Sequence, residues 1–354
     1  MKKILCLSNL RKIGVISAMV VTLVSCKESP LYFADSLQVY KADAIEKIDV
    51  SGQTVIDEAI GAFSLNVVDT VICLSDRQRN EMFSLYNING DSLATVGVLG
   101  QGPSDFTSNS QNKQYVLTPN MAGTWVVDIN STSLKLLDLT ASIDTGKSVV
   151  DSIVPIRAMV SKAFLVKDTL IQEVFGEQNF NLTLSSLDGK WSVEEPLYRH
   201  MLPASELFMF YLGKMGVSPD GKFLVNVMSS INQVNILTLN NERKRISVSV
   251  GGVEAPEKVI DAETHVPVHT FYTGVALSND KIYALYENRP FMASDDDEVK
   301  NSEIHVMDYT GKVVGIMLLD RMCDELAYSS RDKAIYVIDH NEAVVRYPIP
   351  ESMQ

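Results

Sequence analysis

Two histidines, His265 and His269, bracket a short Val-Pro-Val segment and are the residues of this chain best suited to bind a metal ion. Pro267 between them predicts an extended backbone, in which both imidazoles still lie on the same side. Glu263 and Asp261 lie nearby and could add carboxylate ligands. No third ligand is fixed by spacing, so an ordinary loop is the alternative. Nothing in the sequence requires a cofactor, and the identity of any cofactor that does bind stays unknown.

Other residues with chemical potential form no recognisable catalytic set. The acidic run Asp295–Glu298 could bind Ca²⁺, but functional calcium loops alternate their ligands and include a glycine, so a solvated loop is the simpler interpretation. The five histidines give no spacing typical of a Ser-His-Asp or Cys-His arrangement. Catalysis is therefore uncertain, and a binding protein is favoured over an enzyme.

Aromatic residues cluster twice, at Phe208, Phe210 and Tyr211 and again at Phe271 and Tyr272. Aromatic rings can stack on the apolar face of a sugar, and they also fill protein cores. The clusters therefore leave two interpretations open, a carbohydrate-binding platform and ordinary core packing.

A glycine-rich segment contains Gly100, Gly102, Pro103 and Phe106. A dinucleotide-binding fingerprint would need a third glycine at position 105, which is Asp, and a helix after it. The proline and the absence of a helical pattern argue against a phosphate site. We expect a tight connection in which the glycines adopt positive φ and Phe106 enters the core.

The N-terminus has the layout of a secretory signal. Four basic residues precede an apolar run of 12 residues, Ile13–Val24, which is too short to span a bilayer as a helix. The run ends in Leu-Val-Ser-Cys, which resembles the lipobox of bacterial lipoproteins and implies cleavage before Cys26 and lipidation of its thiol. We therefore assign residues 1–25 to a signal peptide, 26–40 to a lipid-anchored linker and 41–354 to the folded domain.

The position after the cysteine bears on localisation. Lys27 stands where lipoproteins kept at the inner membrane carry Asp, so the resemblance implies an outer-membrane lipoprotein, on either the periplasmic or the cell-surface side. The expected membrane contact is through the lipid anchor.

Charge and cysteine content exclude further classes. The chain carries a formal charge of −13, and cleavage removes four of the 31 basic residues, leaving 27 against 44 acidic ones, or −17. Such a charge repels nucleic acid, so we exclude that partner. Besides Cys26, the mature chain contains two cysteines, Cys73 and Cys323. Export would permit a disulfide between them, and two buried thiols are the alternative.

Short segments rich in Val, Ile, Leu, Tyr and Phe recur throughout and predict strands bounded by turns. Six turns precede such strands at steps of 45 to 60 residues: Asp69-Thr70, Ala122-Gly123, Asp168-Thr169, Asp220-Gly221, Asn279-Asp280 and Arg331-Asp332. A unit of about 50 residues with four short strands is typical of a propeller blade. The sequence therefore predicts an all-β, six-bladed β-propeller of four-stranded antiparallel blades.

The last unit has room for only three strands before the chain ends. Because a ring of blades leaves no free edge, the segment before the first blade, around Ala44 to Val50, is expected to supply the missing outer strand. An insertion is expected at Arg289 to Lys300, where the spacing between two turns is longer than in the other units.

Two motifs carry a family resemblance. Ser218-Pro219-Asp220-Gly221-Lys222-Phe223 resembles the turn motif of TolB-like propellers. Gly97 and the segment Gly100–Phe106 resemble a Gly-x-Gly-Pro-Gly-Glu-Phe motif of six-bladed TolB-like lipoproteins, with Ser104-Asp105 in place of Gly-Glu. The resemblance implies a lipid-anchored six-bladed propeller and no particular activity.

These observations favour an envelope lipoprotein that acts as a binding or scaffolding module for an unknown protein or carbohydrate. One alternative is a metal-dependent propeller enzyme of the lactonase or glutaminyl-cyclase type. The second is a glycan-binding surface lipoprotein.

Overall fold

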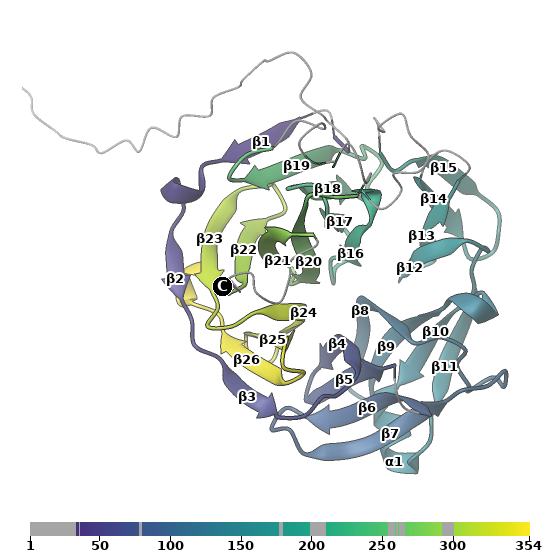
Figure 1. Cartoon of the computed structure of the whole chain (residues 1–354). Coiled ribbons are helices and arrows are strands. Elements are labelled where there is room, and N and C mark those ends of the chain that lie inside the picture. Colours follow the sequence, from purple (N-terminus) through teal and green to yellow (C-terminus); the bar gives the residue numbers. More distant parts are fainter. Residues whose placement is uncertain are drawn as a thin grey trace, which may run out of the picture.

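Six β-sheets radiate from one axis in the computed structural model of the chain, and they follow one another around the ring in chain order (Figure 1). The structure describes residues 33–34, 36–77, 80–176, 180–198, 210–253, 259, 261, 266–291 and 301–354. The expected all-β propeller with six blades is confirmed. Each blade has four antiparallel strands, the innermost beside the axis.

Blades 1 to 3 are each built from four consecutive strands joined by tight turns. Blade 1 comprises β4 (Ala62–Val68), β5 (Val71–Asp76), β6 (Glu81–Asn87) and β7 (Ser92–Val98). Blade 2 comprises β8 (Ser110–Thr118), β9 (Met121–Asp128), β10 (Ser133–Asp138) and β11 (Val150–Pro155). Blade 3 comprises β12 (Val160–Val166), β13 (Thr169–Phe175), β14 (Phe180–Ser186) and β15 (Ser192–Pro196).

Blades 4 and 5 repeat this pattern, while blade 6 takes only three strands from the C-terminal end of the chain. Blade 4 comprises β16 (Gly213–Val217), β17 (Phe223–Met228), β18 (Val234–Thr238) and β19 (Arg245–Val250). Blade 5 comprises β20 (His269–Leu277), β21 (Lys281–Pro290), β22 (Glu303–Asp308) and β23 (Val313–Leu318). Blade 6 contains β24 (Cys323–Ser329), β25 (Ala334–Asp339) and β26 (Val344–Pro348).

The N-terminal strap, residues 36–56, runs along the outside of three successive blades (Figure 1). Its strand β1 (Leu37–Tyr40) pairs in parallel with β19, and β2 (Lys47–Asp49) pairs in parallel with β23. Strand β3 (Gln53–Ile56) pairs antiparallel with β26 and completes blade 6.

An N-terminal strand therefore closes the ring as expected, but the predicted segment is wrong. The segment around Ala44 to Val50 contributes β2, which extends blade 5, and the closing strand is β3. All three strands of the strap are short and largely exposed or half-buried, so their sequence pattern does not distinguish one blade edge from another.

The described part of the expected linker is packed against the propeller. Phe33 and Ala34 are each 1% exposed and belong to a hydrophobic cluster formed by blades 3 and 4. The Phe33 ring lies 6.4 Å from the Tyr198 ring, and the Arg245 guanidinium lies over it at 5.3 Å. The chain is thus held at the junction of these two blades before the strap begins.

Apolar residues lie on both faces of the blades because each blade packs between two neighbours. One α-helix that the strand pattern did not predict, α1 (Leu139–Thr145), connects β10 to β11. The Asp138 side chain accepts a hydrogen bond from the Ala141 N–H at 3.0 Å and caps its start, and Gly146 ends it at φ +65°. Short 3-10 turns occur at Ala42–Ala44, Ile129–Ser131 and Glu351–Met353.

The turn glycines have the backbone conformation that such turns require. Gly90, Gly189, Gly221 and Gly311 all have positive φ, between +71° and +92°. The expected insertion after β21 falls mostly on residues 292–300, which lie outside the described part of the chain, as does the acidic run.

Candidate functional site

A pocket of about 420 Å³ opens between blades 4 and 5. It lies at the end of the ring where β20 and β22 begin and where β19 and β21 end. The strap also contributes to its wall. The lining residues are Ala42, Lys47, Asn232, Val250, Gly251, Gly252, Val253, Phe271, Tyr286, Asn288, Glu303 and His305.

Four aromatic rings form a continuous row along this side of blade 5. His269 stacks on Phe271 at 5.8 Å between centroids, and Phe271 stacks on Tyr286 at 6.4 Å. Tyr286 in turn stacks on His305 at 4.3 Å. The interplanar angles are between 22° and 28°, so the rings are nearly parallel. The last three rings line the pocket, which gives it an aromatic wall.

His305 is held by hydrogen bonds on both sides of its ring. Nδ1 lies 3.0 Å from the Tyr272 hydroxyl and Nε2 lies 3.3 Å from a carboxylate oxygen of Glu303. Burial lowers the pKa of His305, although the Glu303 carboxylate opposes this effect. At neutral pH the ring is therefore uncharged, and an Nε2–H can donate to Glu303.

The charges of the pocket balance. The hydrogen bond from His305 and the nearby Lys47 ammonium lower the pKa of Glu303. Lys47 Nζ lies 3.6 Å from the Glu303 carboxylate, so the two form an ion pair between the strap and blade 5. With His305 neutral, the described residues that line the pocket carry one positive and one negative group. This described part of the wall therefore does not select for a strongly charged ligand.

Asn232 supplies an unused hydrogen-bond acceptor at the pocket. Its side chain is 6% exposed and donates through Nδ2 to the carbonyls of Val250 and Gly252, at 2.8 Å and 3.1 Å. Its Oδ1 is buried and has no hydrogen-bond partner among the residues that the structure describes. A buried acceptor without a partner costs about 1–3 kcal/mol. A ligand or water that donates to this oxygen would remove that cost.

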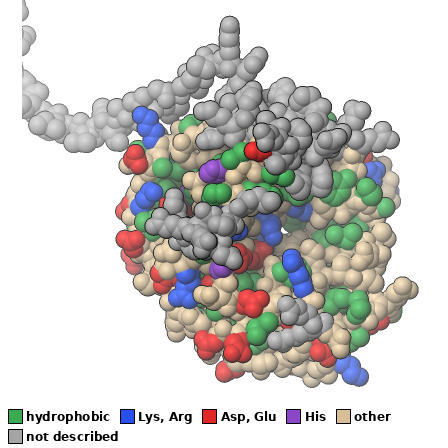
Figure 2. Space-filling view, viewed as in Figure 1, with side chains coloured by type: hydrophobic (Ala, Val, Ile, Leu, Met, Phe, Trp, Pro, Cys, Tyr) green, Lys and Arg blue, Asp and Glu red, His purple; other side chains and the backbone are tan. Residues whose placement is uncertain are grey.

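Polar side chains from blades 2, 4 and 6 meet at the inner strands, beside the axis of the ring. Lys113 Nζ lies 2.9 Å from one carboxylate oxygen of Glu325, and Lys214 Nζ lies 3.3 Å from the other. Burial raises the pKa of Glu325, but the two ammonium groups outweigh burial and lower it overall. A cavity that Lys113 also lines has a volume of about 20 Å³. Figure 2 shows basic side chains beside the hollow at the centre of one face.

The predicted histidine pair is only partly placed. His265 and Glu263 lie outside the described residues, whereas His269 begins β20 and lies 3.4 Å through Nδ1 from the Asn288 side-chain oxygen. In the described part of the chain, no group of three or more His, Cys, Asp or Glu side chains is placed to hold a metal ion. The structure thus places His269 in the aromatic row beside the pocket.

The predicted aromatic clusters are mainly core residues. Phe210 and Tyr211 are buried between blades 3 and 4, and Tyr272 is buried in blade 5, where its hydroxyl supports His305. Phe271 is the member that lines the pocket. Phe208 lies outside the described residues. The described rings of the first cluster, Phe210 and Tyr211, therefore belong to the core and not to a platform shared with Phe271.

The glycine-rich connection between blades 1 and 2 is a structural clamp. Phe106 is fully buried and its ring meets Phe83 edge-on at 5.0 Å. The expectation of positive φ at Gly100 and Gly102 is wrong, since neither adopts it. A Cβ at either position would displace the Asp105 carboxylate, which accepts a hydrogen bond from the Gly102 N–H at 2.8 Å.

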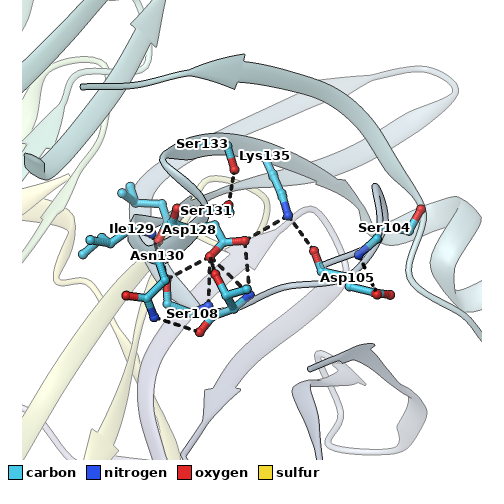
Figure 3. A network of polar contacts seen from close by, with 12 residues as sticks. Ser104, Asp105, Ser108, Asp128, Ile129, Asn130, Ser131, Ser133 and Lys135 are labelled. Carbon is cyan, nitrogen blue, oxygen red and sulfur yellow. Dashed lines mark hydrogen bonds and ion pairs between the residues drawn. The ribbon is translucent and has the colours of Figure 1, made fainter. Parts of the chain in front are cut away.

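A buried ion pair fastens this clamp (Figure 3). Lys135 Nζ donates to the Asp105 backbone carbonyl at 2.6 Å and to the Asp128 carboxylate at 2.9 Å. Asp128 also accepts hydrogen bonds from the Ser108 N–H at 2.9 Å and from the Thr107 hydroxyl. Burial raises the pKa of Asp128, but these hydrogen bonds outweigh it and lower the pKa to about 2. All of these groups form hydrogen bonds or ion pairs within the protein, so the motif stabilises the fold.

The Ser218–Phe223 motif is a turn that likewise stabilises the fold. Asp220 Oδ1 accepts hydrogen bonds from the Lys222 N–H at 3.1 Å and the Ser218 hydroxyl at 2.7 Å. Gly221 has φ +71°, and a Cβ there would lie 2.5 Å from Val166 of blade 3. Glycine is therefore needed both for the turn and for contact between blades.

Cys73 and Cys323 are free thiols in the structure. Cys73 packs in a cluster between blades 1 and 2, and Cys323 packs in a cluster between blades 5 and 6. The disulfide that export would permit is not formed, because the two side chains belong to separate cores. Burial raises the pKa of both thiols, which keeps them protonated.

The sequence did not reveal the residues that make the pocket polar, Lys47, Asn232, Glu303 and His305. They come from the strap and from two blades, and no fixed spacing joins them. One signal was present: Glu303 and His305 are two positions apart in a strand, which places both on the same face of the sheet. None of the helices in the described residues is long and apolar enough to cross a membrane.

Comparison with known proteins agrees with this architecture. A family model described as TolB-like 6-blade propeller-like matches residues 54–330. A crystal structure of a protein from Bacteroides fragilis, described as exported, is similar with a TM-score of 0.50 and 10% identity, over 88% of this chain and 98% of that one. The structure of U3-55K gives the same score and identity, over 84% and 98%.

These two sequence identities are too low to infer a function, so the structural similarity shows the fold alone. No curated protein matches the chain. The family match, in contrast, covers most of the propeller, including the strand that closes it and the clamp between blades 1 and 2. The chain therefore belongs to the TolB-like 6-blade propeller family.

Proposed function

We propose that the protein is an envelope lipoprotein, anchored through Cys26, whose propeller is a binding module. The signal-like N-terminus and the lipobox-like sequence support the anchor, and Lys27 supports the outer membrane as its location. The similar Bacteroides fragilis structure, described as exported, is in keeping with this location. Phe33 and Ala34 pack onto the propeller, which supports a short tether between the binding module and the proposed anchor.

The pocket between blades 4 and 5 is the proposed binding site, and its aromatic wall is the observation that carries the proposal. Phe271 and the half-buried Tyr286 contribute their rings to the wall, while Asn288 and Glu303 offer hydrogen-bond acceptors near them. The charged groups balance within the pocket. This combination suits a neutral saccharide, which presents an apolar ring face for stacking and hydroxyl groups for donation.

Saturation-transfer NMR with a panel of neutral mono- and disaccharides tests the binding site. We expect transfer to the ring protons of at least one saccharide, and loss of that transfer in Phe271→Ala, which removes a ring from the wall. Phe63→Ala is the matched control, because Phe63 lies on β4 of blade 1, away from the pocket. The proposal fails if no saccharide receives saturation, or if Phe271→Ala binds as the unchanged protein does.

The anchor is tested separately by mass spectrometry of the protein from detergent extracts of cells. The expected species begins at Cys26 and carries the added mass of acyl chains, whereas Cys26→Ser moves the protein to the soluble fraction. Recovery of an unmodified Cys26 in the soluble fraction would contradict the lipid anchor and would leave the saccharide test unaffected.

A further inference from the structure

The outer hairpin of blade 3, formed by β14 and β15, is exposed at its tip, and its other end, at Phe180 and Leu197, lies in the cluster that holds Phe33 where the chain enters the propeller. We propose that the anchor holds this hairpin against the lipid bilayer, so that the propeller stands on the membrane on its blade 3 edge. This inference rests on the lipid anchor of the proposed function, and it adds a membrane-contact surface and an orientation.

The length of the tether limits the distance between the propeller and the bilayer. Seven residue steps separate Cys26 from Phe33, and a fully extended chain spans at most about 25 Å over that length. Phe33 is 1% exposed in the cluster between blades 3 and 4. The junction of these blades therefore lies within about 25 Å of the lipidated residue.

The diameter of the propeller is larger than the reach of the tether, which restricts how the propeller can stand on the bilayer. A compact domain with the number of residues in 41–354 has a radius of gyration of about 20 Å, and so measures about 50 Å across. The tether is about half that diameter. When the propeller stands on one edge, that edge is therefore the rim near blades 3 and 4, because the opposite rim near blades 6 and 1 would hold Phe33 too far from the bilayer.

The blade 3 hairpin carries side chains suited to a membrane interface. Leu187, Trp191 and Val193 are 46%, 44% and 43% exposed, although each is a large hydrophobic residue. Lys190 lies between the first two, and its side chain is 82% exposed. Trp is enriched at membrane interfaces, and Lys can extend its ammonium toward headgroups while its stem stays in the apolar layer.

The charges of this hairpin are balanced, unlike those of the chain as a whole. Asp188 pairs with Lys190 at 2.8 Å, and Glu194 pairs with Arg157 at 2.6 Å. Glu195 pairs with Arg243 at 3.1 Å and with Arg245 at 3.3 Å. These are all the carboxylates between residues 187 and 196. An anionic membrane surface therefore repels this edge less than it repels a surface with the average charge of a −13 chain.

The two tryptophans allow a direct test of the orientation. The mature protein, beginning at Cys26, is coupled through that thiol to maleimide phospholipid in vesicles of phosphatidylcholine and phosphatidylglycerol. Cys73 and Cys323 are buried and do not compete for the reagent. Trp191 is exposed, whereas Trp125 is 4% exposed inside the propeller. We expect Trp191 emission to shift to the blue and to be quenched when the lipid chains are brominated, and both effects to be lost in Trp191→Phe.

The matched control moves the probe to the far side of the ring. Leu93 lies on β7, the outer strand of blade 1, and is 39% exposed. In the double variant Trp191→Phe, Leu93→Trp, brominated lipid should leave the emission unchanged. Equal quenching at the two positions, or no quenching of Trp191, overturns the orientation. Because the coupling is chemical, this result does not depend on whether cells lipidate Cys26, which the mass spectrometry described above decides separately.

Discussion

Replacing Asp128 by Asn removes the negative charge of the buried clamp while nearly preserving the size of the side chain. Asp128 is fully buried and Lys135 is 5% exposed, so the substitution leaves an ammonium group in the interior without its counter-ion. The pKa of Asp128, about 2 against an ordinary 3.8, corresponds to about 2 kcal/mol of stabilisation of the carboxylate. Because the Lys135 ammonium is also left buried without a counter-ion, the expected loss of unfolding free energy is about 3–5 kcal/mol.

The same ion pair predicts a pH dependence with a definite sign. Because folding lowers the pKa of Asp128, the folded state favours the carboxylate, and its contribution is fully present above about pH 4. It is lost as the pH falls from about 4 to about 2, where the folded protein also takes up the proton. In Asp128→Asn this contribution is absent, so the difference in stability between the two proteins should shrink over that interval.

Urea titration followed by circular dichroism, repeated between pH 2.5 and pH 7, measures both effects. Asp188→Asn is the control, because its pair with Lys190 is exposed to solvent and should leave the midpoint unchanged at neutral pH. If Asp128→Asn unfolds at the same urea concentration as the control, the clamp does not stabilise the fold. A stability difference that is constant across the acid range would contradict the assigned pKa.

Three further predictions concern the fold. Deleting residues 36–56 removes β1, β2 and β3 and opens blade 6, so thermal denaturation should begin lower and be less cooperative; an unchanged melting curve would contradict closure by the strap. Gly221→Ala should lower the unfolding free energy more than Gly189→Ala does. Both glycines have φ +71°, where alanine costs about 1–2 kcal/mol, but only Gly221 also faces Val166. Equal losses in urea titrations would refute this contact. Cys73 and Cys323 should react with iodoacetamide only after unfolding, as mass spectrometry would show, whereas rapid labelling of the native protein would contradict their burial.

The repeat of turns and apolar segments was sufficient to predict six blades and most of their strands. The predicted turns Asp69-Thr70 and Arg331-Asp332 lie just before β5 and β25, because a buried apolar strand bounded by polar turns leaves a local pattern in the sequence. The pairing of the strap was harder, since β1, β2 and β3 are short and attach to three different edges. The choice among those edges depends on the curvature of the completed ring.

The candidate site could be predicted only in fragments. Phe271 and His269 were identified as residues of interest, but for different kinds of site. Their stacking with Tyr286 and His305 arises because β20, β21 and β22 are neighbours in one sheet, and a single sequence does not specify that alignment. The clamp was located from its glycines, while its fastening by Lys135 was not foreseen.

Local chemistry determined what the sequence could reveal by itself: strand periodicity, turn glycines and a charged-then-apolar N-terminus depend on residues close together in the chain. Only the tertiary structure decided which cavity is polar and aromatic, where the two thiols lie, and that Phe33 joins the tether to blades 3 and 4. The physical reason is that each of these features needs residues far apart in sequence to meet. Their meeting is set by the packing of whole blades around the ring, which no single segment encodes.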